Sequence, residues 1–432
     1  MDRYTIFPPK SKIQGMISLN GSKSITNRAL IMGALANANS ILKNASLSDD
    51  SMALVRALQS LGVSIDVSDD EINIQGHSGQ WIKKGIIDVG PAGTVARFMC
   101  ALLSFIPEGE WILTGNERMQ ERPIGELVDA LRILGVEIEY QNYSGCLPLL
   151  IQGIDPKLAK GKVKIGGNVS SQFISALLLV APILGQGLEI EVEGDLVSKS
   201  YVDMTIAGMA DFGVKVENED YKYLRVAQGQ SYESREYVIE GDASGASYFF
   251  ASAAISQGSV KVYNLSLESL QGDARFPEVL GEMGCSVVHG FDGERNWIEV
   301  SGREPLYGID VDMSSMPDTI QTLAVVATCS KGVTRISGAE TLKNKETNRI
   351  KALIEQLQVI GISAEYNDGE LIVYGGSPRG GIIKTYGDHR MAMSFAILGS
   401  KIEGITIEDP QVVSKSFPSF WHDFQGLGVR VG

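Results

Sequence analysis

One short pattern, an apolar helix followed by a glycine and a β-branched strand, recurs six times along the 432-residue chain. The repeated glycines are separated by 67 to 78 residues and are Gly62, Gly135, Gly213, Gly284, Gly361 and Gly428. Glycine readily adopts the left-handed conformation that ends a helix. Each copy therefore predicts a helix that stops at the glycine and a strand that begins just after it.

A second motif has the same period. Polar loops rich in Gly or Ser open six apolar helices, at residues 21–36, 90–104, 167–182, 241–255, 314–328 and 386–398. A strand such as residues 111–115, WILTG, separates the two helices of each unit. The sequence thus predicts a six-fold repeat of β-α-β-α-β-β units, and the alternation of strands and helices indicates the α/β class.

The sixth copy lacks its last strand, and residues 4–7, YTIF, form a spare strand before the first copy. If that N-terminal strand completes unit six, the units divide three and three. A continuous domain then covers residues 21–240, and a discontinuous domain combines residues 1–20 with 241–432. An open solenoid is the alternative, but solenoid repeats usually span only ~20–50 residues. We expect two closed domains with a ligand cleft between them.

Composition and charge exclude some classes of binding partner. The chain has 52 acidic and 38 basic residues, a net charge of −14, which argues against nucleic acid as a partner. The longest apolar stretch, residues 173–184, is too short to span a bilayer and contains Pro182. The N-terminus lacks an apolar signal core, so no membrane partner is expected either.

Cysteine and histidine are few and scattered, with no CxxC pair, at Cys100, Cys146, Cys285, Cys329, His77, His289, His389 and His422. This spacing favours neither a disulfide framework nor a zinc site. We therefore expect no metal and a reducing, cytoplasmic location.

The helix-opening loops are suited to anions, because a helix N-terminus offers unpaired N–H groups and partial positive charge. Residues 21–24 add Lys23, and corresponding loops carry a basic set: Arg28, Arg97, Arg118, Arg122, Lys199, Lys343, Lys345, Arg349, Arg390 and Lys415. In an acidic chain this bias favours a site for a small polyanion. For each loop alone, helix capping or surface solvation is the alternative.

Four carboxylates lie among or beside these cations: Asp242, Asp318, Glu346 and Asp388. A carboxylate at a helix start usually caps the helix. One surrounded by Lys and Arg can instead transfer protons. Spacing alone leaves both readings open.

Ten ordered segments are specific enough to indicate a family: residues 20–30, 92–97, 118–132, 169–173, 194–201, 240–249, 316–318, 345–349, 388–393 and 414–418. They include NGSKSITNRAL, RMQERPIGELVDALR, EGDASGASYF and DHRMAM. From residue 11 onward the chain closely resembles the 5-enolpyruvylshikimate-3-phosphate synthase family, whose fold has two domains of three such units.

The resemblance implies transfer of the enolpyruvyl group of phosphoenolpyruvate to the 5-hydroxyl of shikimate 3-phosphate, with release of phosphate. This is a shikimate-pathway step towards chorismate and the aromatic amino acids. The resemblance also implies no cofactor, a monomer, and competition between glyphosate and phosphoenolpyruvate, since Gly93 is retained.

Site roles follow from the resemblance position by position. The catalytic residues would be Asp318, Glu346 and Lys23, with possible support from His389. The shikimate 3-phosphate site would comprise Lys23, Ser24, Arg28, Ser170, Ser171, Gln172, Ser198, Tyr201, Asp318 and Lys345. The phosphoenolpyruvate site would comprise Lys23, Gly93, Arg122, Gln172, Arg349, Arg390 and Lys415. Departures from the family pattern are Pro91, Phe98, Thr341 and Asn348, which bear on affinity and glyphosate response.

Three rival functions remain to be weighed. UDP-N-acetylglucosamine enolpyruvyl transferase has the same fold but normally uses a loop cysteine, and residues 115–125 contain none. RNA 3′-terminal phosphate cyclase is built from similar units, but the charge of −14 and the missing histidine context disfavour it. A repeat scaffold with merely capped loops would have no turnover to lose on truncation of Asp318 or Glu346.

Overall fold

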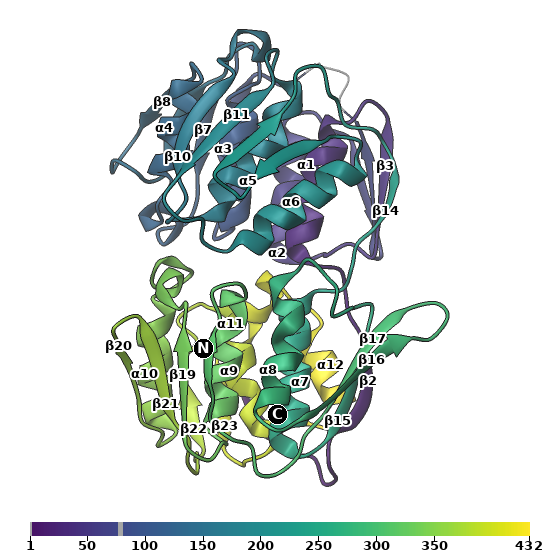
Figure 1. Cartoon of the computed structure of the whole chain (residues 1–432), viewed down its shortest axis with the longest axis vertical. Helices are drawn as coiled ribbons and strands as arrows, with labels where there is room; N and C mark the ends of the chain where they lie inside the picture. The colour runs from purple at the N-terminus through teal and green to yellow at the C-terminus, as the bar shows by residue number, and fades with distance from the viewer. Residues whose placement is uncertain (1, 77–80) are drawn as a thin grey trace. The chain divides into compact units, whose positions relative to one another are not determined.

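The computed structural model describes residues 2–76 and 81–432, so Met1 and His77 lie outside the described residues (Figure 1). The chain forms two compact units. Unit 1 comprises Met1–Asn20 and Glu240–Gly432, and unit 2 comprises Gly21–Ile239. In Figure 1 unit 2 is coloured from purple to teal and most of unit 1 from green to yellow.

Unit 2 contains three four-stranded sheets within residues 21–76 and 81–239. Each has one parallel pair followed by two antiparallel pairs. Across the sheets the strands run as β14 (Glu236–Val238), β3 (Asn39–Lys43), β5 (Glu71–Gln75), β4 (Ile65–Ser68); β6 (Lys84–Asp88), β7 (Glu110–Thr114), β9 (Leu149–Gln152), β8 (Glu137–Tyr140); and β10 (Lys162–Gly166), β11 (Leu188–Glu193), β13 (Tyr223–Val226), β12 (Val216–Glu219).

Unit 1 repeats this plan in three further sheets over its described residues, 2–20 and 240–432. Their strands run as β2 (Gln14–Ser18), β15 (Ser259–Tyr263), β17 (Asn296–Ser301), β16 (Ser286–Phe291); β18 (Asp310–Asp312), β19 (Val333–Ser337), β21 (Glu370–Tyr374), β20 (Ala364–Asn367); and β22 (Gly381–Ile383), β23 (Ile405–Glu408), β1 (Arg3–Phe7), β24 (Arg430–Val431). The α/β class with a six-fold repeat, predicted from the sequence, is confirmed.

The N-terminal strand β1 lies between the last two strands of the chain. Tyr4 pairs with Ile407 of β23, and Ile6 pairs with Val431 of β24 on the other side, both antiparallel. The sixth sheet therefore gains its fourth strand from the opposite end of the chain.

The leading strands of the first and fourth repeats are exchanged between the units. β2 precedes the first helix of unit 2 but pairs with β15 of unit 1, with Ile17 opposite Val262. β14 precedes the first helix of the fourth repeat but pairs with β3 of unit 2, with Tyr237 opposite Leu42. The chain thus passes between the units at residues 20–21 and again at 239–240.

Twelve α-helices are found in residues 2–76 and 81–432. They are α1 (Lys23–Leu35), α2 (Asp49–Ser60), α3 (Gly93–Leu103), α4 (Gly125–Ile133), α5 (Ser171–Val180), α6 (Lys199–Asp211), α7 (Ala243–Ser256), α8 (Phe276–Glu282), α9 (Ile320–Ala327), α10 (Arg349–Val359), α11 (His389–Ala396) and α12 (Phe420–Gly426). None of the helices in this part of the chain is long and apolar enough to cross a membrane.

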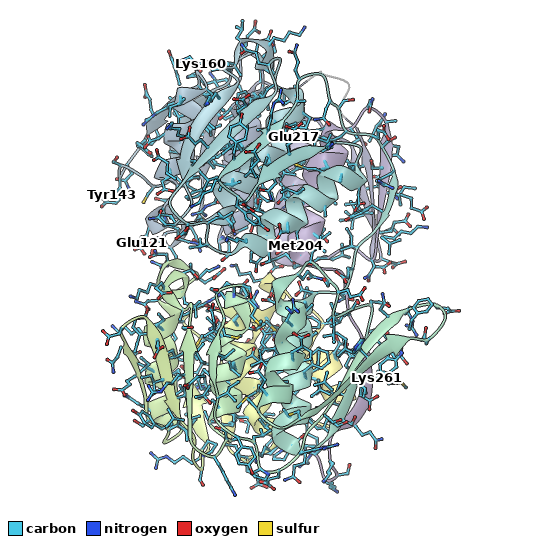
Figure 2. All side chains as sticks on the ribbon, in the orientation of Figure 1. Glu121, Tyr143, Lys160, Met204, Glu217 and Lys261 are labelled. Carbon is cyan, nitrogen blue, oxygen red and sulfur yellow. The ribbon has the colours of Figure 1, made fainter. Side chains whose placement is uncertain are left out.

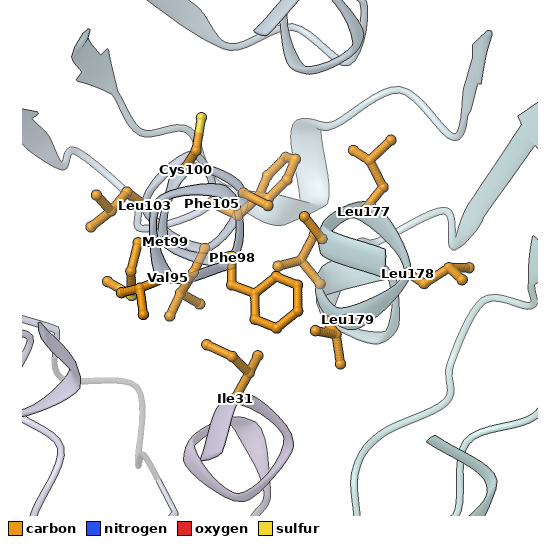
Figure 3. Packing of buried hydrophobic residues seen from close by; sticks show 14 of the residues in the cluster. Ile31, Val95, Phe98, Met99, Cys100, Leu103, Phe105, Leu177, Leu178 and Leu179 are labelled. Carbon is orange, nitrogen blue, oxygen red and sulfur yellow. The ribbon is translucent and has the colours of Figure 1, made fainter. Parts of the chain in front are cut away.

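The first helix of each repeat has most of its residues buried. In unit 2, α1, α3 and α5 pack against one another. Figure 3 shows Phe98 of α3 directed into the space between Ile31 of α1 and Leu179 of α5, all three buried. In unit 1, α9 packs against both α7 and α11 in the same way. These buried helices fix the loops at their N-termini.

The six repeat glycines end the second helices as predicted. All have φ between 82° and 112°, a region that L side chains rarely adopt: Gly62, Gly135, Gly213, Gly284, Gly361 and Gly428. The chain therefore turns from helix to strand at the same point of every repeat.

Candidate functional site

In unit 2 the first cation of the candidate site is the first residue of α1. The Lys23 ammonium lies 3.2 Å from a carboxylate oxygen of Asp50, in the first turn of α2, and both side chains are largely buried. The buried helix α1 and this ion pair hold the ammonium in place. Asp50 was not among the residues predicted from the sequence.

Arg28 lies one turn further along α1 and is almost fully buried, at 2% exposure. Its guanidinium donates to the Thr205 and Ser175 hydroxyls and to the backbone oxygens of Ser24 and Tyr201, at 2.7 to 3.3 Å. All of these acceptors are neutral. Burial accordingly lowers the pKa of Arg28 to about 10, against a smaller raising effect of Tyr201. Within the described residues, Arg28 therefore has no carboxylate among its hydrogen-bond acceptors.

Gly93 at the start of α3 lies directly beneath a second arginine. A Cβ atom added at Gly93 would lie 2.5 Å from one guanidinium nitrogen of Arg122, whose side chain is largely buried. The loop that carries Arg122 is tied to α3 by Arg97, which donates to the backbone oxygens of Pro123 at 2.6 Å and Gly93 at 3.1 Å. Only glycine allows this approach of helix and guanidinium.

Replacing Gly93 by alanine should therefore push the Arg122 guanidinium from its place. Overpacking of this kind costs ~1–3 kcal/mol. Since the resemblance places Gly93 and Arg122 in a phosphoenolpyruvate site, we expect the KM for phosphoenolpyruvate to rise roughly ten- to hundredfold. Inhibition by glyphosate should weaken in parallel. Steady-state kinetics test this, with Gly426→Ala as control because no atom lies within 4 Å of its added Cβ. An unchanged KM in Gly93→Ala would refute the role of the close contact.

Neighbouring Arg118 behaves differently from Arg122. Its guanidinium pairs with the exposed carboxylate of Glu121 at 2.8 Å, and Glu121 is labelled at the surface in Figure 2. Of the two arginines in this loop, only Arg122 is buried.

The remaining predicted residues of unit 2 lie at the starts of α5 and α6. The Ser170 hydroxyl caps α5 by accepting the backbone N–H of Gln172 at 3.3 Å. The Gln172 amide donates to the Thr94 hydroxyl at 3.2 Å, which joins the starts of α5 and α3. Ser171 is buried within α5, while Ser198 precedes α6 with φ of 52°. Tyr201 lies in the first turn of α6 beside Arg28.

In unit 1 three cations surround Asp318, which lies in a short 3-10 turn just before α9. Its carboxylate oxygens lie 2.7 Å from Arg390, 3.4 Å from Arg349 and 3.5 Å from Lys345. Burial raises the pKa of Asp318, but the charges of Arg390, Lys345 and Arg349 outweigh it and hold the pKa well below its usual range. Asp318 is therefore ionised at neutral pH.

Glu346 lies in the loop before α10 and shares a cation with Asp318. One carboxylate oxygen of Glu346 is 2.7 Å from Arg349, and the other is 2.5 Å from the ammonium of Lys415. Arg349 thus contacts both acidic side chains. Two carboxylates and four cations, Lys345, Arg349, Arg390 and Lys415, form one cluster, which we call the Asp318 cluster.

Arg349 is anchored from behind by Asp388, the N-cap residue of α11. The two side chains are 1% and 0% exposed, and a guanidinium nitrogen lies 2.7 Å from the carboxylate. Burial lowers the pKa of Arg349, but Asp388, Glu346 and Asp318 together raise it above its usual value. Asp388 also accepts the backbone N–H of Arg390 at 2.9 Å. It caps a helix and neutralises a buried charge at once.

His389 begins α11 and is 1% exposed, with its Nδ1 3.8 Å from a carboxylate oxygen of Asp388. His389 therefore lies beside Asp388, the residue that contacts both Arg349 and the backbone N–H of Arg390.

Two side chains behind this cluster were not predicted from the sequence. Asp273 lies in a short 3-10 helix, η4 (Gly272–Arg275), and accepts a hydrogen bond from the hydroxyl of Ser244 on α7. Ser244 belongs to the segment EGDASGASYF but was assigned no role, and Asp273 stands in QGDARF, where the one basic residue is Arg275. An aspartate at this position is typical of the start of a helix, so the sequence around Asp273 does not indicate a functional role.

The four departures from the family pattern have separate surroundings. Phe98 is buried in the core, with its ring centroid 5.5 Å from the guanidinium carbon of Arg28. Asn348 caps α10 by accepting the Lys351 N–H at 3.1 Å, as an aspartate would. The Thr341 hydroxyl is buried and has no hydrogen-bond partner among the described residues, and Pro91 is exposed.

Within residues 2–76 and 81–432 there is no group of three or more His, Cys, Asp or Glu side chains that could hold a metal ion. Cys100 is fully buried, and burial raises the pKa of its thiol to about 12. Its thiol is therefore protonated at neutral pH, unlike a reactive cysteine.

Known proteins with related sequences cover nearly the whole chain. The relative from Trichormus variabilis named 3-phosphoshikimate 1-carboxyvinyltransferase is 42% identical over 427 residues, covering 98% of this chain and 99% of the relative. One of the same name from Shewanella amazonensis is 42% identical over 425 residues, covering 97% of both chains.

The fold matches a solved structure along its whole length. An EPSP synthase from Acinetobacter baumannii superposes with a TM-score of 0.83 and 24% identity, covering 100% of both chains. A family model described as EPSP synthase (3-phosphoshikimate 1-carboxyvinyltransferase) matches residues 8–424. On the family model and the near full-length relatives together, the chain belongs to the EPSP synthase family.

Proposed function

We propose that Asp318 and Glu346 carry out the proton transfers in enolpyruvyl transfer from phosphoenolpyruvate to the 5-hydroxyl of shikimate 3-phosphate. Family membership makes the chain a transferase with EPSP synthase activity, in the shikimate pathway of aromatic amino acid biosynthesis. One observation carries the assignment of roles. Both carboxylates contact the same buried guanidinium, that of Arg349, inside a cluster of cations suited to phosphate and carboxylate.

The reaction would proceed by addition and then elimination. Asp318 accepts the proton of the 5-hydroxyl as the hydroxyl oxygen bonds to C2 of phosphoenolpyruvate, and Glu346, in its protonated form, gives its proton to the C3 methylene. The intermediate then returns a methyl proton to Glu346, the C2–C3 double bond re-forms, the C2–O bond to phosphate breaks, and the proton on Asp318 leaves with the phosphate. One such acid or base group typically contributes ~10²–10⁴-fold to the rate.

The cations around Asp318 make its basicity depend on whether substrates are bound. Without ligands, three cations stabilise its carboxylate and make it a weak base. When a bound phosphate and carboxylate neutralise Arg390, Lys345 and Arg349, that stabilisation is shared, and the basicity of Asp318 rises. Substrate binding would therefore prepare the base for its proton transfer.

The binding roles are those that the resemblance implies. The shikimate 3-phosphate site would comprise Lys23, Ser24, Arg28, Ser170, Ser171, Gln172, Ser198, Tyr201, Asp318 and Lys345. The phosphoenolpyruvate site would comprise Lys23, Gly93, Arg122, Gln172, Arg349, Arg390 and Lys415. Arg28 supports this assignment, because the hydrogen-bond acceptors of its buried guanidinium in the described residues are all neutral.

Phosphate release from the purified protein tests the function. We expect release only when phosphoenolpyruvate and shikimate 3-phosphate are both present, with each omitted in turn as the control. Release that requires UDP-N-acetylglucosamine in place of shikimate 3-phosphate would contradict the acceptor. No release with either acceptor would contradict enolpyruvyl transfer altogether.

We also infer from the resemblance a cytoplasmic monomer that needs neither a metal nor an organic cofactor. Light scattering after size exclusion should then give a mass near 46.6 kDa. A chelator should leave turnover unchanged. We also propose that the chain divides into a continuous domain and a discontinuous domain, each of three repeats.

A further inference from the structure

Behind the Asp318 cluster lies a buried acidic side chain to which the proposed reaction gives no role. Asp273 is 5% exposed, and its carboxylate accepts the hydroxyl hydrogen of Ser244. The same Ser244 oxygen lies 3.4 Å from a terminal nitrogen of Arg390, which also donates to Asp318 at 2.7 Å. Four side chains from four elements thus form one hydrogen-bonded series, Asp273–Ser244–Arg390–Asp318.

The direction of the bonds in this series is set by chemistry. A serine hydroxyl has one hydrogen and two acceptor lone pairs, while an ionised carboxylate only accepts. Since the Ser244 hydrogen is given to Asp273, the oxygen of Ser244 presents its lone pairs to the guanidinium of Arg390. An ionised Asp273 therefore makes Ser244 an obligatory acceptor for Arg390.

We propose that Asp273, acting through Ser244, is a positioning residue that holds Arg390 in place for phosphoenolpyruvate binding and for its contact with Asp318. This rests on the proposed function, in which Arg390 binds phosphoenolpyruvate. Arg390 also donates to the hydroxyl of Tyr248, 3.4 Å away. Ser244 thus supplies one of the acceptors that fix the orientation of this guanidinium.

Groups of both charges face Asp273 from the elements packed around it. Burial, and then Asp318, raise the pKa of Asp273 to about 7, Asp242 of α7 adds to the rise, and Arg390 of α11 and the Ser244 hydroxyl oppose it. On α8, Glu278 is paired with Arg275 at the surface.

Asp273 therefore changes charge in the neutral range. Below about pH 7 the Asp273 carboxyl is neutral and carries a hydrogen that it can donate. The donor and acceptor roles in the hydrogen bonds of Asp273, Ser244 and Arg390 are then no longer fixed.

The raised pKa of Asp273 also affects the stability of the protein in the absence of substrate. The folded pKa of Asp273 is raised above the usual carboxyl value, so the folded state binds this proton more tightly than the unfolded state. Its contribution to the free energy of unfolding is complete below pH 4 and is lost as the pH rises to about 7. Asp273→Asn should remove this slope, and the cooperative unfolding transition measured for it would show that the variant is folded.

Kinetics of the full chain at pH 6 and pH 8 test the positioning role. We expect Asp273→Asn and Ser244→Ala to raise the KM for phosphoenolpyruvate ~10–100-fold at pH 8, because a displaced guanidinium binds poorly. At pH 6, where the native Asp273 is protonated, the difference from wild type should shrink. Ser244→Thr, which keeps the hydroxyl, should restore binding, and the double variant should lose no more than either single one.

Glu240→Gln is the matched control. Glu240 is also a largely buried carboxylate whose pKa is raised by burial, and it accepts from the Ser269 hydroxyl at 2.5 Å. Glu240 also accepts a hydrogen bond from the Gln271 amide at 3.0 Å, and the proposed series Asp273–Ser244–Arg390–Asp318 does not include it. Its replacement should leave the KM at both pH values unchanged.

The outcomes separate this inference from the proposed function. An active wild type, together with an unchanged KM in both Asp273→Asn and Ser244→Ala, would overturn the positioning role alone. An equal loss in Glu240→Gln would do the same, since it would indicate a general effect of burial. If the wild type released no phosphate, calorimetric titration with phosphoenolpyruvate would decide, and equal affinities of wild type and Ser244→Ala at pH 8 would overturn the inference.

Discussion

Asp318→Asn should reduce kcat by ~10²–10⁴-fold while the protein remains folded. The amide keeps the shape of the side chain but accepts no proton at neutral pH, so the 5-hydroxyl loses its base. Asparagine also removes the negative charge shared by Arg390, Lys345 and Arg349. Steady-state turnover and the circular dichroism spectrum would be measured on the same preparation.

Asp312→Asn is the control for this loss. Asp312 precedes the same loop, is exposed, and accepts the backbone N–H of Ser314 at 2.9 Å, a bond that asparagine can keep. We expect its kcat to match wild type. A kcat for Asp318→Asn within a factor of about three of wild type would remove Asp318 from the chemistry, given that a working base contributes ~10²-fold or more.

Arg349→Met should destabilise the protein by ~3–5 kcal/mol, because it leaves the fully buried Asp388 without its charged partner. It should also abolish turnover, since Arg349 contacts both Asp318 and Glu346. Urea unfolding would measure the loss of stability, with Arg335→Met as control. Arg335 pairs at 3.9 Å with an exposed carboxylate, that of Asp310, and such surface pairs contribute ~0–1 kcal/mol.

A second substitution distinguishes loss of the ion pair from loss of packing. In Arg349→Met/Asp388→Asn the buried negative charge is gone, but asparagine can still cap α11 by accepting the Arg390 N–H. Stability should recover by a large part of the loss, while turnover stays absent. No recovery would mean that the methionine fails to pack, and that the unpaired carboxylate is not the cause.

Sequence reasoning predicted the frame of this molecule well, because its signals are local. A glycine at a helix end and a polar loop before an apolar helix each report on a few residues, and the period multiplies the signal. Gly62 and its five counterparts all adopt the predicted left-handed conformation. The resemblance then supplied the cations and carboxylates that the structure gathers in the Asp318 cluster.

What the sequence left out depends on contacts between distant segments. Nothing in QGMIS or EYVIE indicates which sheet each strand joins, since both have the alternation of any leading strand. Asp50 and Asp273 acquire meaning only from Lys23 and Ser244, which lie 27 and 29 residues away. Ser198 occupies a left-handed conformation that its residue type does not announce.

The placement of β1 bears on how the protein is made. This strand precedes all the other described strands, whereas its partners β23 and β24 begin at residues 405 and 430, so it can pair only after those residues have been synthesised. β2 waits in the same way for β15, whereas every strand of unit 2 is available once residue 238 has emerged. Unit 2 is therefore expected to fold during translation. Unit 1 is expected to complete its sheets only at the end of translation. Until then β1 and β2 are exposed to chaperones or to wrong pairing.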